Sequence, residues 1–285
     1  MPSLIDIRRR IRSVRSTQQI TKAMKMVSAA KLRRAQDRVI AARPYTAALA
    51  KTLSNVATAA AAEQAVDNPL LASRPENRIL LALITSDKGL AGAFNANLIK
   101  GAQRFIVEHA PAQVTIELIG RKGRDFFHKR GAATSGEHVG LAAKAHYADV
   151  AAIARKAMDM FRREEVDSVW VIYNEFKSVM AQRLTVARLL PVPPPERADP
   201  RHYIFEETPA VLLAELLPKY VEAEFYRAVL ESVAAEHAAR MTAMDAATSN
   251  AAEMIDKLTL HMNRVRQASI TKEIIEVVSG AAAAG

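Results

Sequence analysis

The sequence contains no cysteine among its 285 residues. This absence excludes disulfide bonds, thiolate metal sites and a cysteine nucleophile. The sequence also has no stretch approaching the ~18 uncharged apolar residues of a membrane span, and its start, MPSLIDIRRRIRSVRS, lacks the apolar core of a signal peptide. We therefore expect a soluble chain that stays in the cytoplasm and reaches a membrane only through partners.

Acidic residues are scarce near the amino end of the chain. Residues 1–57 contain thirteen Lys or Arg residues but only Asp6 and Asp37 as acids, a local charge of +11, whereas the whole chain carries +10. A solvated helix face would account for this charge, and so would an acidic partner, either a protein or a nucleic acid. The concentration of charge in one segment favours the partner.

The amino-terminal segment has the pattern of one long helix. Ser3 and Asp6 resemble a capping box, and no glycine occurs through Arg43. We expect a coiled-coil helix over residues 1–66, with a kink or an interruption near Pro44. The apolar residues that recur at three- and four-residue steps are Ile7, Ile11, Val14, Ala23, Met24, Val27 and Ala30.

The carboxyl-terminal segment, residues 208–285, has a sustained heptad pattern. Thr208 and Pro209 suit an N-cap and a first helical position, and no glycine follows before Gly280. Pro218 predicts a kink near the start of this coiled-coil helix. The positions at heptad spacing are Leu213, Leu216, Tyr220, Ala223, Arg227, Leu230, Ala234, His237, Met241, Met244, Thr248, Ala251, Ile255, Leu258, Met262 and Val265.

The length of this helix limits how the chain is arranged. If continuous, residues 219–279 would form a helix of about 90 Å, whereas a compact globule of this chain length is only about 50 Å across. The helix should therefore extend beyond the globule with its apolar seam exposed, unless another long helix covers it. The amino-terminal helix is the candidate, so we expect the two to form an antiparallel pair.

The middle of the chain, residues 75–205, alternates β-rich runs with helix-like stretches. The runs are RILLALIT, QVTIELIG, SVWVIYNEF and QRLTVARLL, and a loop rich in small residues precedes ADVAAIARK. This alternation predicts a mostly parallel sheet covered by helices. Five of the twelve prolines fall within 191–200, which predicts the end of this domain.

The first β-rich run leads into the glycine-rich stretch SDKGLAGAFNANL, residues 86–98. A phosphate loop needs a Lys and a Ser or Thr after its glycines, or the spacing G-x-G-x-x-G. Here Lys88 precedes Gly89 and Gly92, so the spacing favours a tight strand-to-helix turn over a nucleotide site. The seven histidines form no i, i+4 pair, so metal binding is not expected either.

Three stretches carry a likeness to a known family. IRSVRSTQQITKAMKMVSAAKLRRAQDR (11–38), TSDKGLAGAFNANL (85–98) and RQASITKEIIEVVSGA (266–281) resemble the hallmark stretches of the gamma subunits of F-type ATP synthases, in the same order along the chain. The resemblance implies an α/β fold in which a long antiparallel coiled coil of the terminal helices carries an inserted Rossmann-like domain. It implies the bacterial form, since the regulatory cysteine segment of chloroplast relatives is missing.

The resemblance also implies a function. Such a subunit is the central-stalk rotor that couples proton translocation to ATP synthesis or hydrolysis and regulates ATPase activity and proton flow. It carries no catalytic site and no cofactor. The implied partners are three alpha and three beta subunits, the epsilon subunit, the ring of c subunits and, within the complex, delta. The implied location is peripheral, at the cytoplasmic face of the bacterial inner membrane.

The residues expected to contact partners lie in the three matched stretches or beside them. Asp87 and Lys88 are expected to face the lower part of the ring or stalk, and Met24 is expected where the shaft passes moving loops of beta. The remaining candidates are a basic stripe and a carboxyl-terminal group: Arg8, Arg12, Arg15, Lys22, Lys25 and Arg33, and Arg266, Gln267, Thr271 and Glu273.

Two alternatives remain open at this point. A basic coiled-coil protein that binds nucleic acid or acts as a scaffold would use the same Arg-rich helix on phosphates, with steeply salt-dependent affinity. A nucleotide-dependent enzyme based on residues 75–205 would instead show saturable nucleotide binding by that domain.

Overall fold

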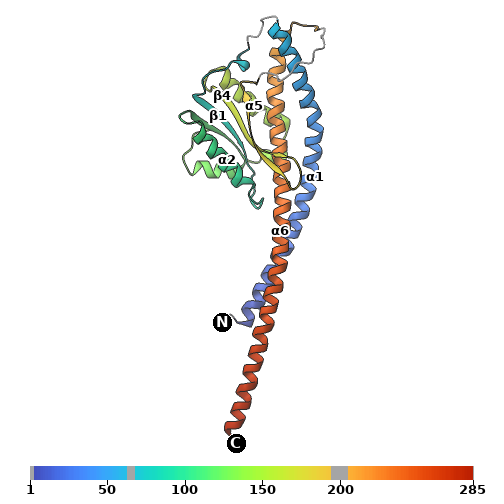
Figure 1. Cartoon of the computed structure of the whole chain (residues 1–285), viewed down its shortest axis with the longest axis vertical. Helices are drawn as coiled ribbons and strands as arrows, with labels where there is room; N and C mark the ends of the chain where they lie inside the picture. Colours follow the sequence, from blue (N-terminus) through green and yellow to red (C-terminus); the bar gives the residue numbers. More distant parts are fainter. Residues whose placement is uncertain (1–2, 63–67, 194–204, 285) are drawn as a thin grey trace. The chain divides into compact units, whose positions relative to one another are not determined.

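The computed structural model describes residues 3–62, 68–193 and 205–284 (Figure 1). Two compact units make up the chain. The first combines Met1–Ser28 with Met241–Gly285, and the second is Ala29–Arg240. Each unit is described by itself below.

Two long helices contribute to both units. Helix α1 is Leu4–Ala62 and helix α6 is Pro209–Ala284, and Pro44 and Pro218 lie inside them. Neither helix is interrupted at its proline. Buried residues flank each proline, Val39 and Leu49 around Pro44 and Leu217 and Val221 around Pro218, and their packing holds the adjacent turns. The expected helical residues 63–66 and most of the proline-rich stretch 191–200 lie outside the described residues.

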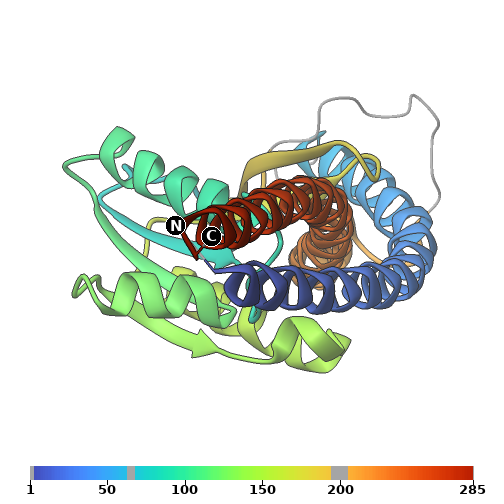
Figure 2. The ribbon, with the colours of Figure 1, turned by 90° about the horizontal axis from the view of Figure 1, so that it is seen from below.

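In the first unit, the two helices run antiparallel. The hydroxyl groups of Thr21 and Thr248 lie 2.8 Å apart, and Lys25 Nζ lies 2.6 Å from Asp245 Oδ1. Along α1 the residue number rises from 21 to 25, while the number of the α6 residue in contact falls from 248 to 245, so the helices are antiparallel. The first turns of α1 lie beside α6, and the end of α6 continues past them (Figures 1 and 2). The expected pairing of the terminal helices is therefore present in this unit.

The buried face of α1 differs in part from the predicted stripe. Ile7 and Ile11 are buried as predicted, but Ala23, Val27 and Ala30 are exposed, and Thr21 and Ser28 are buried instead. The prediction from apolar spacing was wrong at these positions because a small hydroxyl side chain can be buried between two helices when it forms a hydrogen bond there, as Thr21 does with Thr248. Apolar Ile20, Met26 and Val27 consequently face outward.

The last part of α6 has no helix beside it within the described part of this unit. The register at Thr21 and Thr248, extended along the pair, brings the start of α1 at Leu4 level with residues near 265 of α6. Beyond that level the helix exposes apolar side chains to solvent. They are Ile270, Ile274, Ile275, Val277 and Val278, between 48% and 70% exposed.

The second unit is built on a five-stranded sheet in the order β3-β2-β1-β4-β5. The strands β1 (Arg78–Ile84), β2 (Gln113–Ile119), β3 (Thr134–His138) and β4 (Ser168–Phe176) are parallel, and β5 (Gln182–Leu190) is antiparallel to β4. The central strand β1 is buried from Ile79 to Ile84, as its continuous apolar run predicts. The expected mostly parallel sheet is confirmed.

Helices cover both faces of this sheet. Helices α2 (Phe94–Glu108) and α3 (Arg121–His128) lie on one face, where Phe105 contacts Trp170 of β4. Helix α5 (Tyr147–Arg162) and the first part of α6 lie on the other face. There Ile153 and Phe225 border the same small cavity as Leu80 of β1. The short helices η1 (Pro69–Leu71) and α4 (Leu141–Lys144) complete the unit.

One strand falls in the stretch that the sequence predicted to be a loop. Edge strand β3 forms beside a buried carboxylate, Glu117 of β2, which accepts hydrogen bonds from His138 (2.7 Å) and Lys156 (2.9 Å). A Cβ at Gly136 would lie 2.5 Å from Glu117 Oε1, so any other residue there would have to displace this bonded carboxylate. Burial alone would raise the pKa of Glu117, but the bonds from His138 and Lys156 outweigh it and hold the pKa below its usual value.

The turn after β2 depends on one glycine. Gly120 has φ +92°, and a Cβ there would lie 2.1 Å from the carbonyl oxygen of Thr85. Thr85 in turn donates to Ile119 O and accepts from the Gly123 amide. Any side chain at position 120 would therefore force apart the ends of β1 and β2, where the glycine-rich loop begins.

We predict that Gly120→Ala destabilises the protein by about 3 kcal/mol or more, because strain and a backbone clash add together. The matched control is Gly131→Ala, since Gly131 also has positive φ (+64°) but open space around its Cβ position. The control should cost only about 1–2 kcal/mol. Urea unfolding of both variants measures the difference, and equal losses would contradict a role for the close contact.

Candidate functional site

Ten of the thirteen expected contact residues lie in the first unit. On α1, Arg8, Arg12 and Arg15 are exposed and spaced at four and three residues, which places them on one side of the helix. Lys22 is exposed, and Met24 is half-buried. The expected stripe therefore offers positive charge to solvent along one side of the amino-terminal turns.

Lys25 differs from the other cations of this stripe. Its ammonium group is bound to Asp245 across the helix pair, with 42% of the lysine side chain and 57% of the aspartate side chain exposed. An ion pair that is so exposed stabilises the helix pair by at most about 1 kcal/mol. Lys25 can exchange Asp245 for another carboxylate at little cost, so its contact with a partner stays a prediction.

The carboxyl-terminal group lies on the single-helix part of α6. Arg266, Gln267, Thr271 and Glu273 are all exposed. Thr271 Oγ1 donates to the carbonyl of Gln267, and Ser269 Oγ donates to Glu273. These bonds stay within one helix, so the outward faces of the four side chains remain available.

The other three expected residues, Arg33, Asp87 and Lys88, lie in the second unit. Arg33 is exposed on α1. The carboxylate of Asp87 accepts hydrogen bonds from the backbone amides of Arg121 and Gly140, each at 3.1 Å. Asp87 therefore holds together the three loops that follow β1, β2 and β3, at the carboxyl ends of these strands. Its contact with a partner stays a prediction.

The glycine-rich loop is fixed by its carbonyl groups. Arg240 of α6 donates to Lys88 O (3.2 Å) and to Gly89 O (3.3 Å), while Ser86 and Asn95 hydrogen-bond across the base of the loop. A phosphate cradle would direct backbone amides toward its ligand, whereas this loop directs carbonyls toward a cation. The geometry agrees with the tight turn that the spacing predicted.

Arg240 is the residue of α6 that holds the glycine-rich loop, and it was not among the site residues predicted from the sequence. Its side chain is 9% exposed and also pairs with Glu236 at 2.7 Å. Burial raises the pKa of Glu236 despite the opposing effect of Arg240. The spacing Glu-x-x-x-Arg is the favourable i, i+4 helix pair, so the sequence did hold a signal for it.

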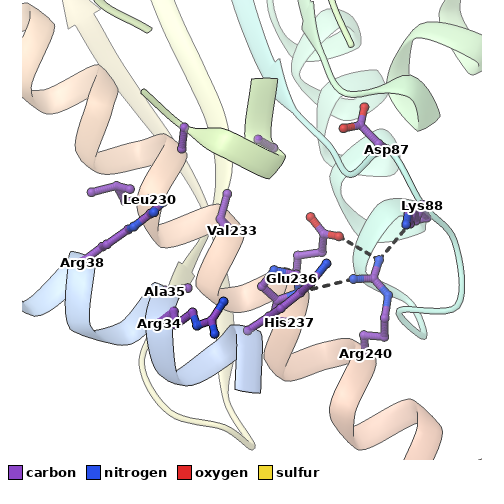
Figure 3. A pocket seen from close by; sticks show the side chains of 13 residues that line it. Arg34, Ala35, Arg38, Asp87, Lys88, Leu230, Val233, Glu236, His237 and Arg240 are labelled. Atoms are coloured by element: carbon purple, nitrogen blue, oxygen red, sulfur yellow. Dashed lines mark hydrogen bonds and ion pairs between the residues drawn. The ribbon is translucent and has the colours of Figure 1, made fainter. Parts of the chain in front are cut away.

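A cavity of about 270 Å³ lies beside the loop (Figure 3). Its walls come from α1, α4, α6 and the loop itself. Cations dominate among its charged side chains: Lys31, Arg34, Arg38, Lys88 and Arg240, against Asp87 and Glu236. His237 lines the same cavity and is half-buried, and its Nδ1 atom lies 3.4 Å from Arg240 Nη1.

Comparison with known proteins decides the family. The family model described as ATP synthase matches residues 3–284. The ATP synthase gamma chain of Solibacter usitatus is 73% identical over 285 residues and covers all of both chains. The chain belongs to the ATP synthase gamma-chain family. The gamma chain of Pelotomaculum thermopropionicum is 49% identical over 99% of both chains.

Solved structures agree on the fold. A chain of the Tetrahymena thermophila mitochondrial ATP synthase central stalk and c-ring structure is 26% identical with a TM-score of 0.61, covering 80% of this chain and 99% of its own. A chain of the Euglena gracilis mitochondrial ATP synthase structure is 17% identical with a TM-score of 0.67, covering 98% and 94%. Within the described ranges, no helix is both long and apolar enough to cross a membrane.

We predict that Arg240→Gln releases the loop. Because hydrogen bonds from charged groups contribute about 1.5 kcal/mol or more, trypsin should cleave after Lys88 about tenfold faster than in the unsubstituted chain. The control variant Glu236→Gln/Arg240→Gln removes the buried unpaired carboxylate, so it should regain global stability without regaining loop protection. An unchanged cleavage rate in Arg240→Gln would show that the loop is held by other contacts.

Proposed function

We propose that the chain is the central-stalk rotor of a bacterial F-type ATP synthase, which couples proton translocation to ATP synthesis or hydrolysis by rotation. As a gamma chain it is part of the enzyme complex. In the proposal it holds no catalytic site, binds no cofactor, and is peripheral at the cytoplasmic face of the inner membrane. Its partners are three alpha and three beta subunits, epsilon, the c ring and, within the complex, delta.

The observation that carries this proposal is the antiparallel pair of the first unit and the single helix that continues from it. The pair is basic along Arg8, Arg12 and Arg15, whereas the single helix ends in exposed apolar side chains such as Ile274 and Val277. An apolar helix end in a nonpolar sleeve makes few directional hydrogen bonds, so few orientations would trap it. A helix end of this kind suits rotation.

Asymmetry supplies the coupling in the proposed mechanism. Three chemically identical beta sites can differ in affinity only if something breaks their symmetry, and a pair of unequal helices contacts each site's subunit differently. Shifting one site between 1:99 and 99:1 needs about 5.5 kcal/mol of differential interaction. Exposed ion pairs contribute only about 0–1 kcal/mol each, so several must act together.

The residues assigned to partner contact in this proposal come from three segments: α1, the glycine-rich loop and the end of α6. The basic groups of α1 meet acidic segments of beta, Met24 passes its moving loops, and the carboxyl-terminal group meets a second beta loop. Asp87 and Lys88 contact the lower part of the ring or stalk. The full set is Arg8, Arg12, Arg15, Lys22, Met24, Lys25, Arg33, Asp87, Lys88, Arg266, Gln267, Thr271 and Glu273.

Reconstitution tests the proposal. Purified alpha and beta subunits, assayed with and without this chain, should form a stable complex with multisite ATP hydrolysis only when the chain is present. A bead attached to the second unit should then rotate while ATP is hydrolysed. Equal assembly and equal multisite hydrolysis without the chain would overturn the proposal.

A pair of double variants tests the basic stripe. We expect Arg8→Gln/Arg12→Gln to weaken association with the alpha and beta subunits by about 5- to 30-fold at low salt, and less at high salt. The control, Arg9→Gln/Arg10→Gln, removes the same charge from positions turned about 100° and 200° away from Arg8 on the helix. Binding kinetics at two salt concentrations measure the effect. Equal losses in both double variants would mean that only total charge matters.

A further inference from the structure

The cavity beside the glycine-rich loop carries more positive charge than the protein around it neutralises. We propose that this cavity binds a small multivalent oxyanion of the phosphate class. The inference rests on the second unit alone and does not depend on the rotor proposal.

Three of the cations that line the cavity have free donors. Within the described part of the chain, the side-chain nitrogens of Lys31, Arg34 and Lys88 form no hydrogen bond or ion pair with protein. Arg34 and Lys88 come from different segments and lie on either side of Glu236 and His237 (Figure 3). These three cations are exposed around one cavity, so they repel one another, and an anion bound among them would relieve that repulsion.

The two acids of the cavity do not neutralise these cations. The Asp87 carboxylate accepts from the backbone amides of Arg121 and Gly140, and Glu236 pairs with Arg240. Arg38, the remaining cation, donates to a backbone carbonyl that carries no charge. The net charge at the cavity is therefore positive.

His237 adds a neutral donor. Arg240 Nη1 lies 3.4 Å from His237 Nδ1, and because a guanidinium can only donate, Nδ1 is the acceptor and the ring proton is on Nε2. Burial lowers the pKa of His237 to about 4, with the charges of Arg240 and Lys31 acting in the same direction. The ring is therefore neutral at pH 7, with an Nε2–H group that has no acceptor among the described residues.

The number of donors and the volume select the ligand class. A cavity of about 270 Å³ is small for a whole nucleotide but sufficient for a phosphate or pyrophosphate group. Lys31, Arg34, Lys88 and His237 offer more donors than the two oxygens of a single carboxylate would use, whereas a phosphate group presents three or four oxygens. Apolar Leu230 and Val233 line the same cavity and limit the competing water.

Calorimetric titration of the purified full-length chain with pyrophosphate, at constant ionic strength, tests the proposal. We expect one saturable site. Arg34→Gln should weaken binding about tenfold, the effect of losing one charge-assisted contact. The matched control is Arg163→Gln, because Arg163 is an exposed arginine at the end of α5, outside the cavity lining, and this variant should bind as the unsubstituted chain does. Separate titrations with inorganic phosphate and ADP identify the source of the phosphate group.

A second readout is specific to the cavity. Bound anion favours the imidazolium form, so saturating pyrophosphate should move the NMR titration midpoint of His237 to higher pH, and this shift should be smaller in Arg34→Gln. The proposal is wrong if no saturable binding occurs, if Arg163→Gln loses as much affinity as Arg34→Gln, or if the His237 midpoint does not move. It is also wrong if Arg34→Gln impairs assembly with alpha and beta while pyrophosphate fails to bind, because the cavity would then be a protein contact.

Discussion

A helix cannot bury its own apolar seam, and this constraint governs both ends of the chain. In the first unit, Ile7 and Ile11 of α1 are buried in an antiparallel pair with α6. In the second unit the same two helices run antiparallel again, because Lys31 lies near His237 whereas Arg43, further along α1, pairs with the earlier Glu231 of α6. Helix α6 also covers one face of the sheet there. The apolar seam of α1 is thus covered by α6, from the other end of the chain, and α6 is covered by α1 and the sheet. Both terminal helices are therefore necessary to the fold.

Buried charges fix the register of this packing. Glu231 accepts from Arg43 of α1 and from the Phe176 amide of β4, while Glu222 accepts from Arg155 and Tyr147 of α5. Apolar contacts alone would tolerate a slip of the helix along the sheet, but a slip would leave these carboxylates buried without partners, at a cost of several kcal/mol. Arg240 acts in the same way on the glycine-rich loop, since its donors need the Lys88 and Gly89 carbonyls at fixed positions.

The sequence predicted the features that depend on local pattern and missed those that depend on distant partners. Heptad spacing and the continuous run of β1 predicted the terminal helices and the parallel sheet. The buried positions of Thr21 and Ser28 could not be predicted, because a polar residue can be buried between two helices only if the opposite helix suits it, and the local pattern does not show the opposite helix. Strand β3 was missed for the same reason, since its Gly136 makes room for Glu117 of another strand. At the loop, the glycine spacing predicted the tight turn, but it could not show that a basic cavity lies beside it.

The charged side chains of this chain are of two kinds, exposed ones and ones bonded within the fold, and only the exposed ones can contact other subunits. Charges that hold the fold, such as Glu117 and Arg240, are buried and bonded within the unit, so they are not free to pair with another subunit. The cations of α1 from Arg8 to Lys22 are solvated and exchange partners at low cost, which many short-lived contacts in succession require. A surface of weak, replaceable contacts on a rigid, internally bonded support can move past several partners without being held by any one of them.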